Sequence, residues 1–156
     1  MKQEIERKFI VIGDEWRATA GTGEMCCQGY ITAEPAGATV RVRLLADRGF
    51  LTIKGSTKGI SRSECEYEIP AADAEYMMEN LCGDRLVSKK RYNVKCGGLV
   101  WEIDEFLGLN EGLLIAEIEL EREDQHFEKP AWAGEEVTFD PRYTNAVLAR
   151  RPFVHW

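Results

Sequence analysis

The chain has 156 residues, of which 44% are hydrophobic and 30% are charged, and its net charge is -7. This length and composition predict one folded domain spanning residues 1–156, and no apolar run approaches the roughly 20 residues that cross a bilayer. The acidic balance argues against binding to nucleic acid, whose phosphate backbone requires an extended basic surface. The early acids Glu4 and Glu6 and the lack of an apolar h-region predict no signal peptide, so a cytoplasmic location is the default expectation.

Period-two alternation of polar and apolar residues is the strongest signal along the chain, and it predicts β-strands. In the first predicted strand, residues 3–11, the charged residues Glu4, Glu6 and Lys8 alternate with Ile5 and Phe9. Similar patterns predict strands over about 27–32, 39–45, 51–54, 62–69, 89–96, 101–104 and 117–121. The fold class is therefore mainly β, and eight strands with this spacing are typical of an antiparallel meander or barrel.

Helices are expected to be few and short. Residues 72–81 have an amphipathic pattern, residues 143–150 follow Asp140-Pro141, and residues 14–18 form a weaker candidate. The pair Gly97-Gly98 predicts a hairpin turn between two strands. Residues 123–136 are polar and irregular, and they are interpreted as a mobile excursion. Arg7 alone places a charge in the apolar phase of its strand, and no role is predicted for it.

The five cysteines are an odd number without C-x-x-C spacing or a neighbouring histidine. They predict buried free thiols and neither a disulfide framework nor a zinc site. The two histidines, His126 and His155, lie outside any cluster, and we expect them to be surface or packing residues.

The alternating charges have two interpretations. They are usually the solvent-facing side of an antiparallel sheet, with the apolar sides meeting in one core. In the alternative, the barrel is inverted, so that the charges line a lumen and the apolar sides point outward under helices and loops. Periodicity does not distinguish inside from outside.

The balance of charge in the polar phase favours a site for ions. The acids in this phase are Glu4, Glu6, Glu64, Glu66, Glu102, Asp104, Glu117 and Glu119, and the bases are Lys8, Arg41, Arg43, Lys54, Arg62, Lys89 and Arg91. Buried charges are tolerated when they are paired or bind ions, and two divalent cations would bring this set to a charge that suits a triphosphate. Carboxylate ligands without histidine suit Mg²⁺ or Mn²⁺.

The same residues carry a family resemblance. The motif Glu4-x-Glu6-x-Lys8 is similar to the E-x-E-x-K signature of the CYTH superfamily, the triphosphate tunnel metalloenzymes. The later family motifs are resembled, in order, by Gln28-Gly29-Tyr30, Arg41-Val42-Arg43, Leu51-Thr52-Ile53-Lys54, Arg62 with Glu64 and Glu66, Lys89-Lys90-Arg91-Tyr92, Trp101-Glu102-Ile103-Asp104 and Glu117-x-Glu119. The resemblance covers residues 3 to about 121.

The resemblance implies an eight-stranded antiparallel barrel that forms an open tunnel, with the charged faces inside and a few helices packed outside. It implies that Lys8 and Arg41 are catalytic and that Lys8, Arg41, Arg43, Lys54, Arg62, Lys89 and Arg91 bind the phosphates. Metal, Mg²⁺ or Mn²⁺ with two ions per site, would be held by Glu4, Glu6, Glu117 and Glu119, with Glu64, Glu66, Glu102 and Asp104 as further ligands or outer-shell partners.

The implied activity is metal-dependent hydrolysis of a terminal phosphoanhydride in a linear triphosphate. Inorganic tripolyphosphate is the preferred substrate because residues 3–9, QEIERKF, resemble the bacterial inorganic triphosphatase branch. The alternatives left open are a nucleoside or thiamine triphosphatase, an adenylate cyclase, a polyphosphate- or nucleotide-binding module without turnover, and an apolar-core barrel for a hydrophobic ligand. The expected partner is the small-molecule triphosphate, with no nucleic acid and no membrane, and a homodimer remains open.

Overall fold

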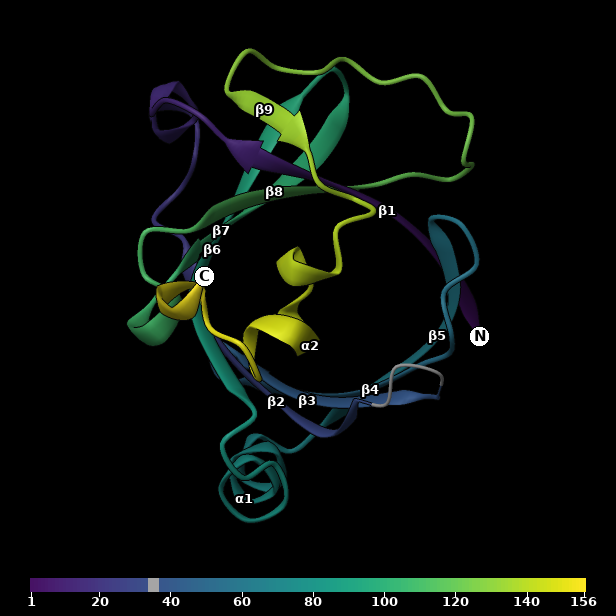
Figure 1. Cartoon of the computed structure of the whole chain (residues 1–156), viewed down its shortest axis with the longest axis vertical. Helices are drawn as coiled ribbons and strands as arrows, with labels where there is room; N and C mark the ends of the chain where they lie inside the picture. Colours follow the sequence, from purple (N-terminus) through teal and green to yellow (C-terminus); the bar gives the residue numbers. More distant parts are fainter. Residues whose placement is uncertain (34–36) are drawn as a thin grey trace.

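A closed antiparallel barrel dominates the computed structural model, which describes residues 1–33 and 37–156 (Figure 1). Its eight strands are β1 (Lys2–Val11), β2 (Glu24–Ala33), β3 (Thr39–Leu45), β4 (Arg48–Lys54), β5 (Ser61–Ile69), β6 (Leu86–Cys96), β7 (Leu99–Phe106) and β8 (Leu114–Glu119). They follow the order β5-β4-β3-β2-β6-β7-β8-β1, and a β5–β1 pairing closes the ring. The predicted barrel is confirmed.

Strand β1 closes the barrel by pairing with two strands along its length. Near its start Glu4 lies opposite Arg62 of β5, and further along Lys8 lies opposite Glu117 of β8. A short ninth strand, β9 (Ala133–Glu136), adds to the far end of β1. Because side chains alternate across a strand, this register turns Glu4 and Lys8 to the same side of the barrel wall.

The largest hydrophobic core lies outside the barrel wall. It contains the buried side chains of Ile5, Phe9, Val11, Trp16, Tyr92, Val94, Trp101, Ile103, Ala116, Ile118, Leu120, Trp132 and Ala133. The 3₁₀ helix η1 (Glu15–Ala18), β9 and Phe127 of the segment before β9 contribute to its cover. The outward direction expected for Ile5 and Phe9 is confirmed, although a 3₁₀ turn, a strand and a loop make the cover.

Helix α1 (Ala71–Leu81) packs on the outside of β2, β3 and β4. Ala74 is fully buried in this contact, which is close because β4 has a glycine, Gly49, beneath the helix. A Cβ at Gly49 would lie 2.8 Å from the carbonyl oxygen of Ile69 and 3.0 Å from Cβ of Ala74. A larger residue at position 49 would therefore push the helix away from the sheet.

The C-terminal segment closes one end of the lumen. It contains η3 (Pro141–Tyr143), α2 (Asn145–Leu148) and η4 (Phe153–His155), and α2 lies inside the ring of strands when the barrel is viewed end-on (Figure 1). The side chains that meet there form a second core of Tyr30, Val87, Phe106, Leu113, Ile115, Leu148 and Ala149. The tunnel implied by the resemblance is thus charged over one part and filled by apolar side chains over another.

Several predicted boundaries change. The excursion expected over 123–136 ends in β9, the strand expected over 117–121 is β8 at 114–119, and the helix expected over 143–150 is the shorter α2. The weak helix at 14–18 is the 3₁₀ helix η1, and a further 3₁₀ turn, η2 (Gly108–Asn110), precedes β8.

The cysteines are free, as predicted, with Cys26 and Cys82 buried and the other three half-buried. No helix among the described residues is long and apolar enough to cross a membrane.

Candidate functional site

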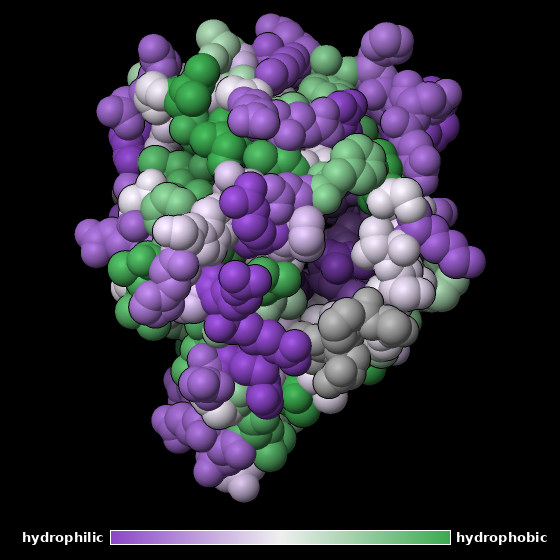
Figure 2. All heavy atoms as spheres, in the orientation of Figure 1, coloured by the Kyte–Doolittle hydropathy of each residue, from purple (hydrophilic) through white to green (hydrophobic). Residues whose placement is uncertain are grey.

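A cavity of about 730 Å³ occupies the charged part of the lumen. Figure 2 shows a hollow in this face of the molecule with a hydrophilic interior. The predicted residues that line the cavity are Glu4, Glu6, Lys8, Arg41, Arg43, Lys54, Arg62, Glu64, Glu66, Arg91, Glu102, Glu117 and Glu119. All the candidates therefore lie on its wall except Lys89 and Asp104. Acids and bases from β1, β3, β4, β5, β6, β7 and β8 meet in one space.

Lys8 lies between two carboxylates. Its Nζ donates hydrogen bonds to Glu6 of the same strand and to Glu117 of β8, and the Lys8 residue is only 9% exposed. Burial alone would lower the pKa of Lys8, but the charges of Glu117 and Glu6 outweigh it and raise the pKa above its ordinary value. The ammonium group therefore stays charged throughout the physiological pH range.

Glu4 is held by two bases from neighbouring strands. Its two carboxylate oxygens accept from Nζ of Lys54 and from Nε of Arg62, each at 2.5 Å, and Lys54 also contacts Glu64 at 2.9 Å. Burial would raise the pKa of Glu4, but Lys54 and Arg62 lower it to about 2. Glu4 is thus an anion whose charge is compensated by Lys54 and Arg62.

Arg91 binds three carboxylates at the opposite wall. It donates two hydrogen bonds of 2.7 Å to Asp104, and it also donates to Glu117 at 3.0 Å and to Glu102. Burial and the neighbouring charges of Glu117 and Asp104 raise the pKa of Glu102, although Arg91 opposes this. Three carboxylates therefore share the guanidinium of Arg91, and Lys8 and Lys89 pair with two of them.

Lys89 and Asp104 are buried behind the cavity wall. Nζ of Lys89 donates to Asp104 at 2.5 Å and to Oδ1 of Asn145 at 3.2 Å, and both charged side chains are almost completely inaccessible. Asp104 also holds the guanidinium of Arg91 from behind. In this arrangement Lys89 and Asp104 support Arg91 and the C-terminal segment without contacting the cavity themselves.

Among residues 1–33 and 37–156, Arg41 and Arg43 share a single anionic partner. Both guanidinium groups donate to the one carboxylate of Glu66, at 3.2 and 3.1 Å, and Thr52 accepts from Arg41 at 3.1 Å. The Nε atoms of both arginines are buried and have no hydrogen-bond partner among the described residues. Burial and the charge of Arg41 lower the pKa of Arg43. Two cations that share one acid and keep unused donors form a site for an anion.

The acids suit a divalent cation in chemistry but not yet in arrangement. Oxygen ligands from carboxylates are those that Mg²⁺ and Mn²⁺ prefer. Among the described residues, however, no three acidic, histidine or cysteine side chains are gathered as a ready-made metal site. The acids are held by bases instead, as Glu119 is by Lys2 at the rim, 2.5 Å away. A metal bound here would replace such an ammonium or guanidinium partner.

The C-terminal segment contributes residues that the sequence interpretation missed. Thr144, Asn145 and Arg150 line the cavity, as does Tyr30, whose hydroxyl accepts a hydrogen bond of 2.7 Å from Gln28. Thr144, Asn145 and Arg150 lie in and beside the short helix α2 rather than in an alternating strand, so period-two reasoning gave no signal for them. Tyr30 lies on β2, within the motif Gln28-Gly29-Tyr30, but no role in the site was predicted for it. Apolar residues in the lumen phase, such as Ile115, were the available sign that another element enters the barrel.

The family of the chain follows from comparison with known proteins. A model of the CYTH domain matches residues 2–145. The chain belongs to the CYTH family. The resemblance of the strand motifs is thereby confirmed, and the match ends within α2, before Leu148 and the rest of the C-terminal segment.

Individual CYTH relatives are similar over nearly their whole length. A protein of Acetivibrio thermocellus named inorganic triphosphatase is 50% identical over 153 residues, which are 98% of this chain and 97% of the relative. A second inorganic triphosphatase, from Nitrosomonas europaea, is 39% identical, covering 94% of this chain and 96% of the relative. The crystal structure of the inorganic triphosphatase NE1496 superposes with a TM-score of 0.64 at 35% identity, over 94% of this chain and 97% of that one.

Proposed function

We propose that this CYTH protein hydrolyses a terminal phosphoanhydride bond of a linear triphosphate, with inorganic tripolyphosphate as its preferred substrate. The products are pyrophosphate and phosphate. The proposal is supported by the two relatives named inorganic triphosphatase, at 50% and 39% identity, and by the charged cavity in the barrel.

The observation that carries the proposal is the shared use of Glu66 by Arg41 and Arg43. Both arginines line the cavity that a triphosphate would enter, and among the described residues their two positive charges share one carboxylate. Guanidinium groups bind phosphate oxygens through paired hydrogen bonds, and lysines contribute point charges. A bound anion would take over one or both arginines, so that Glu66 would no longer have to pair with both of them.

The bases of this chain bind and orient the substrate. Arg41, Arg43, Lys54, Arg62 and Arg91 clamp the phosphate chain, while Lys89 supports Arg91 from behind. Lys8, fixed between Glu6 and Glu117, neutralises charge at the reacting phosphate, and Arg41 shares this role. Phosphoryl transfer depends mainly on positioning and charge neutralisation, so such a clamp supplies much of what the reaction needs. Water is the nucleophile.

Divalent metal completes the proposed site. Glu4, Glu6, Glu117 and Glu119 would hold Mg²⁺ or Mn²⁺, two ions per site, with Glu64, Glu66 and Glu102 as further ligands or partners. Asp104, which is buried behind the cavity wall, would act only as an outer partner. Such ions neutralise phosphate charge and acidify water. The fit is one of donor chemistry, since the acids that would hold the metal are carboxylates, each of which pairs with a lysine in this structure.

The shape of the lumen favours an inorganic chain over an organic triphosphate. Leu148 and its neighbours close one end with apolar contacts, and Tyr30 is the one aromatic side chain among the described residues that line the cavity. Recognition of a nucleobase ordinarily uses an aromatic stacking surface with an open space beside it. A linear phosphate chain is bound by basic side chains and needs no such aromatic surface.

A parallel assay tests the proposal. Purified protein is given tripolyphosphate, ATP or thiamine triphosphate with Mg²⁺ or Mn²⁺, and phosphate, pyrophosphate and cyclic AMP are measured. We expect metal-dependent phosphate release that is fastest from tripolyphosphate. Cyclic AMP from ATP would identify a cyclase instead, and binding without any product would overturn the enzymatic proposal.

A further inference from the structure

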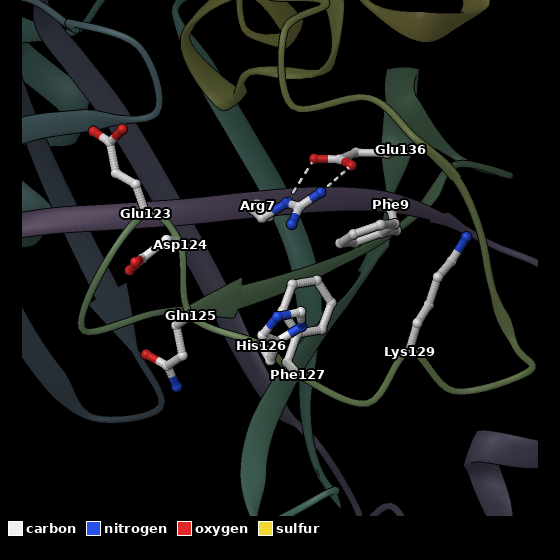
Figure 3. Close-up of a pocket in the computed structure, with 9 residues that line it drawn as sticks. All are labelled: Arg7, Phe9, Glu123, Asp124, Gln125, His126, Phe127, Lys129 and Glu136. Carbon is white, nitrogen blue, oxygen red and sulfur yellow. Dashed lines mark hydrogen bonds and ion pairs between the residues drawn. The ribbon is translucent and has the colours of Figure 1, made fainter.

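Arg7, the charge in the apolar phase of β1, lies outside the barrel. Its Nε donates to Oε1 of Glu136 at 2.8 Å, and its Nη2 donates to the other oxygen of the same carboxylate. Figure 3 shows this paired contact between β1 and β9, with the rings of Phe9 and Phe127 beside the guanidinium. The centre of the guanidinium lies 5.0 Å from the centre of the Phe127 ring. Arg7 therefore fixes the direction of Glu136 with little freedom.

The contact continues from Glu136 to the main chain of Lys8. The hydroxyl of Thr138 donates to Oε1 of Glu136 at 2.6 Å, so its lone pairs are free for another donor. The backbone N–H of Lys8 donates to that same hydroxyl at 3.0 Å. One residue before Thr138, the N–H of Val137 donates to the carbonyl oxygen of Lys8 at 2.9 Å. Both main-chain polar groups of Lys8 are thus held by residues 137 and 138.

Lys8 extends its side chain from β1 into the lumen of the barrel. Its backbone is held from outside the wall, while its Nζ is held inside by Glu6 and Glu117. A lysine side chain is long, so the direction in which it leaves the strand depends on how firmly its own peptide groups are fixed. Small displacements of a group that supports a reacting phosphate reduce the rate of reaction strongly.

We infer that Arg7, Glu136 and Thr138 form an outer clamp that positions Lys8 for phosphoryl transfer. The three residues do not touch the substrate, and they act through the peptide N–H of Lys8. This inference rests on the proposed function, because the role of Lys8 in turnover belongs to that proposal. It also assigns a role to Arg7 and to the β9 segment, which the alternation pattern left without one.

The decisive change is in the hydroxyl of Thr138. Thr138→Val removes the acceptor for the Lys8 N–H while preserving size, and Thr138→Ser restores the hydroxyl. For Thr138→Val we expect kcat on tripolyphosphate to fall at least about tenfold with KM changed less than about threefold, and we expect Thr138→Ser to recover most of the rate. Arg7→Ala should lower kcat in the same way, and Arg7→Ala with Thr138→Val should be no worse than the more damaging single change.

Arg48 supplies a matched control. It forms a paired contact with Glu68 across neighbouring strands and lies 5.0 Å from the Phe50 ring, as Arg7 does with Glu136 and Phe127. Unlike the Arg7 pair, this pair has no hydrogen bond that leads to Lys8 among the described residues, and neither arginine lines the cavity. Arg48→Ala should therefore keep kcat within about twofold of the unmodified protein. An equal loss of kcat in Arg48→Ala and Arg7→Ala would show a general effect of losing a surface pair and would overturn the clamp.

A second readout does not depend on turnover. Amide hydrogen exchange measured by NMR should be faster at Lys8 in Thr138→Val than in Thr138→Ser. Faster exchange with unchanged kcat would overturn positioning of Lys8, and unchanged exchange would overturn the contact itself. If the unmodified protein releases no phosphate from any triphosphate, the proposed function fails, and the exchange data still show separately whether the clamp holds the Lys8 backbone.

Discussion

Lys8 and Glu117 face each other across the β1–β8 ladder, and Nζ of Lys8 donates a hydrogen bond to the Glu117 carboxylate inside the lumen. Both residues are less than one-tenth exposed. The charges of Glu117 and Glu6 raise the pKa of Lys8 despite its burial. The pair thus provides a fixed cation at the wall of the cavity.

Lys8→Met removes this cation at similar length. We expect kcat on tripolyphosphate to fall at least about 100-fold, as when a preorganised electrostatic donor is lost from an active site. Stability should also fall, by about 1–3 kcal/mol, because Glu6 and Glu117 each lose a buried partner. The measurements are steady-state phosphate release and urea unfolding. Lys90→Met is the control, because Lys90 follows Lys89 on β6 and its side chain lies on the outer face, with Nζ 5.4 Å from the centre of the Tyr92 ring. An equal loss of kcat in Lys90→Met would refute the role of Lys8.

The double change of Glu4 and Glu6 to Gln tests the proposed metal site. Gln keeps the size of each side chain but removes two anionic ligands, so metal-dependent turnover should be abolished while far-UV circular dichroism remains that of the folded barrel. Glu68→Gln is a matched control. Glu68 alternates in phase with the cavity residues Glu64 and Glu66 of β5, but its own side chain is 57% exposed and does not line the cavity. Full activity of the double variant would contradict the metal assignment.

Metal and triphosphate should bind cooperatively. The acids that would hold the cation are paired with the bases that would hold the phosphates, as Glu4 is with Lys54 and Arg62. Either ligand alone would leave charges of one sign without partners, whereas both together compensate each other. In thermal unfolding, Mn²⁺ with tripolyphosphate should therefore raise the Tm by more than the sum of the two separate shifts. Simple additivity, with sodium chloride at matched ionic strength as the reference, would argue against shared partners.

How far the sequence predicts this site depends on the residue. Glu4, Glu6 and Lys8 were placed correctly on one face because alternation depends only on local backbone geometry, and the CYTH motifs supplied the direction of that face. The segment 133–136, with the sequence AGEE, has weak β-propensity, so its sequence predicts only part of a mobile excursion. It becomes a strand because β1 offers it a free edge, and such tertiary pairing is not visible in the segment itself.

The apolar end of the lumen is a second feature that could not be predicted from the sequence pattern alone. Residues 143–150 were predicted to be helical, but the pattern did not show that this helix enters the barrel. The sign was present in the strands, since Val87, Phe106 and Ile115 follow the same phase as the charged residues and would otherwise line an empty polar tunnel. Burial of such side chains requires an apolar partner, and the C-terminal segment supplies it.

Acid should weaken the fold through Glu4. Its pKa is lowered to about 2 in the folded protein from an ordinary value of 4.5, so the folded state binds its proton less readily than the unfolded chain does. The stabilisation is fully present above about pH 4.5 and is lost as the pH falls towards 2, and it amounts to at most about 3 kcal/mol. Urea unfolding at pH 6, 4 and 3 should show a steeper loss of stability for the unmodified protein than for Glu4→Gln. Parallel pH dependences of the two proteins would contradict the lowered pKa.

Leu148 should be essential to the stability of the closed end of the lumen. Its side chain is fully buried against the apolar lumen residues, although it lies beyond the segment that matches the CYTH domain. Leu148→Ala removes buried surface and leaves a cavity, so the free energy of unfolding should fall by about 2–5 kcal/mol. Leu148→Met keeps the volume and should cost less than about 1.5 kcal/mol.

Leu109→Ala, at a residue that is 62% exposed on η2, is the control and should change stability by less than about 0.5 kcal/mol. If Leu148→Ala unfolds at the same urea concentration as Leu109→Ala, then the C-terminal segment does not pack inside the barrel in solution.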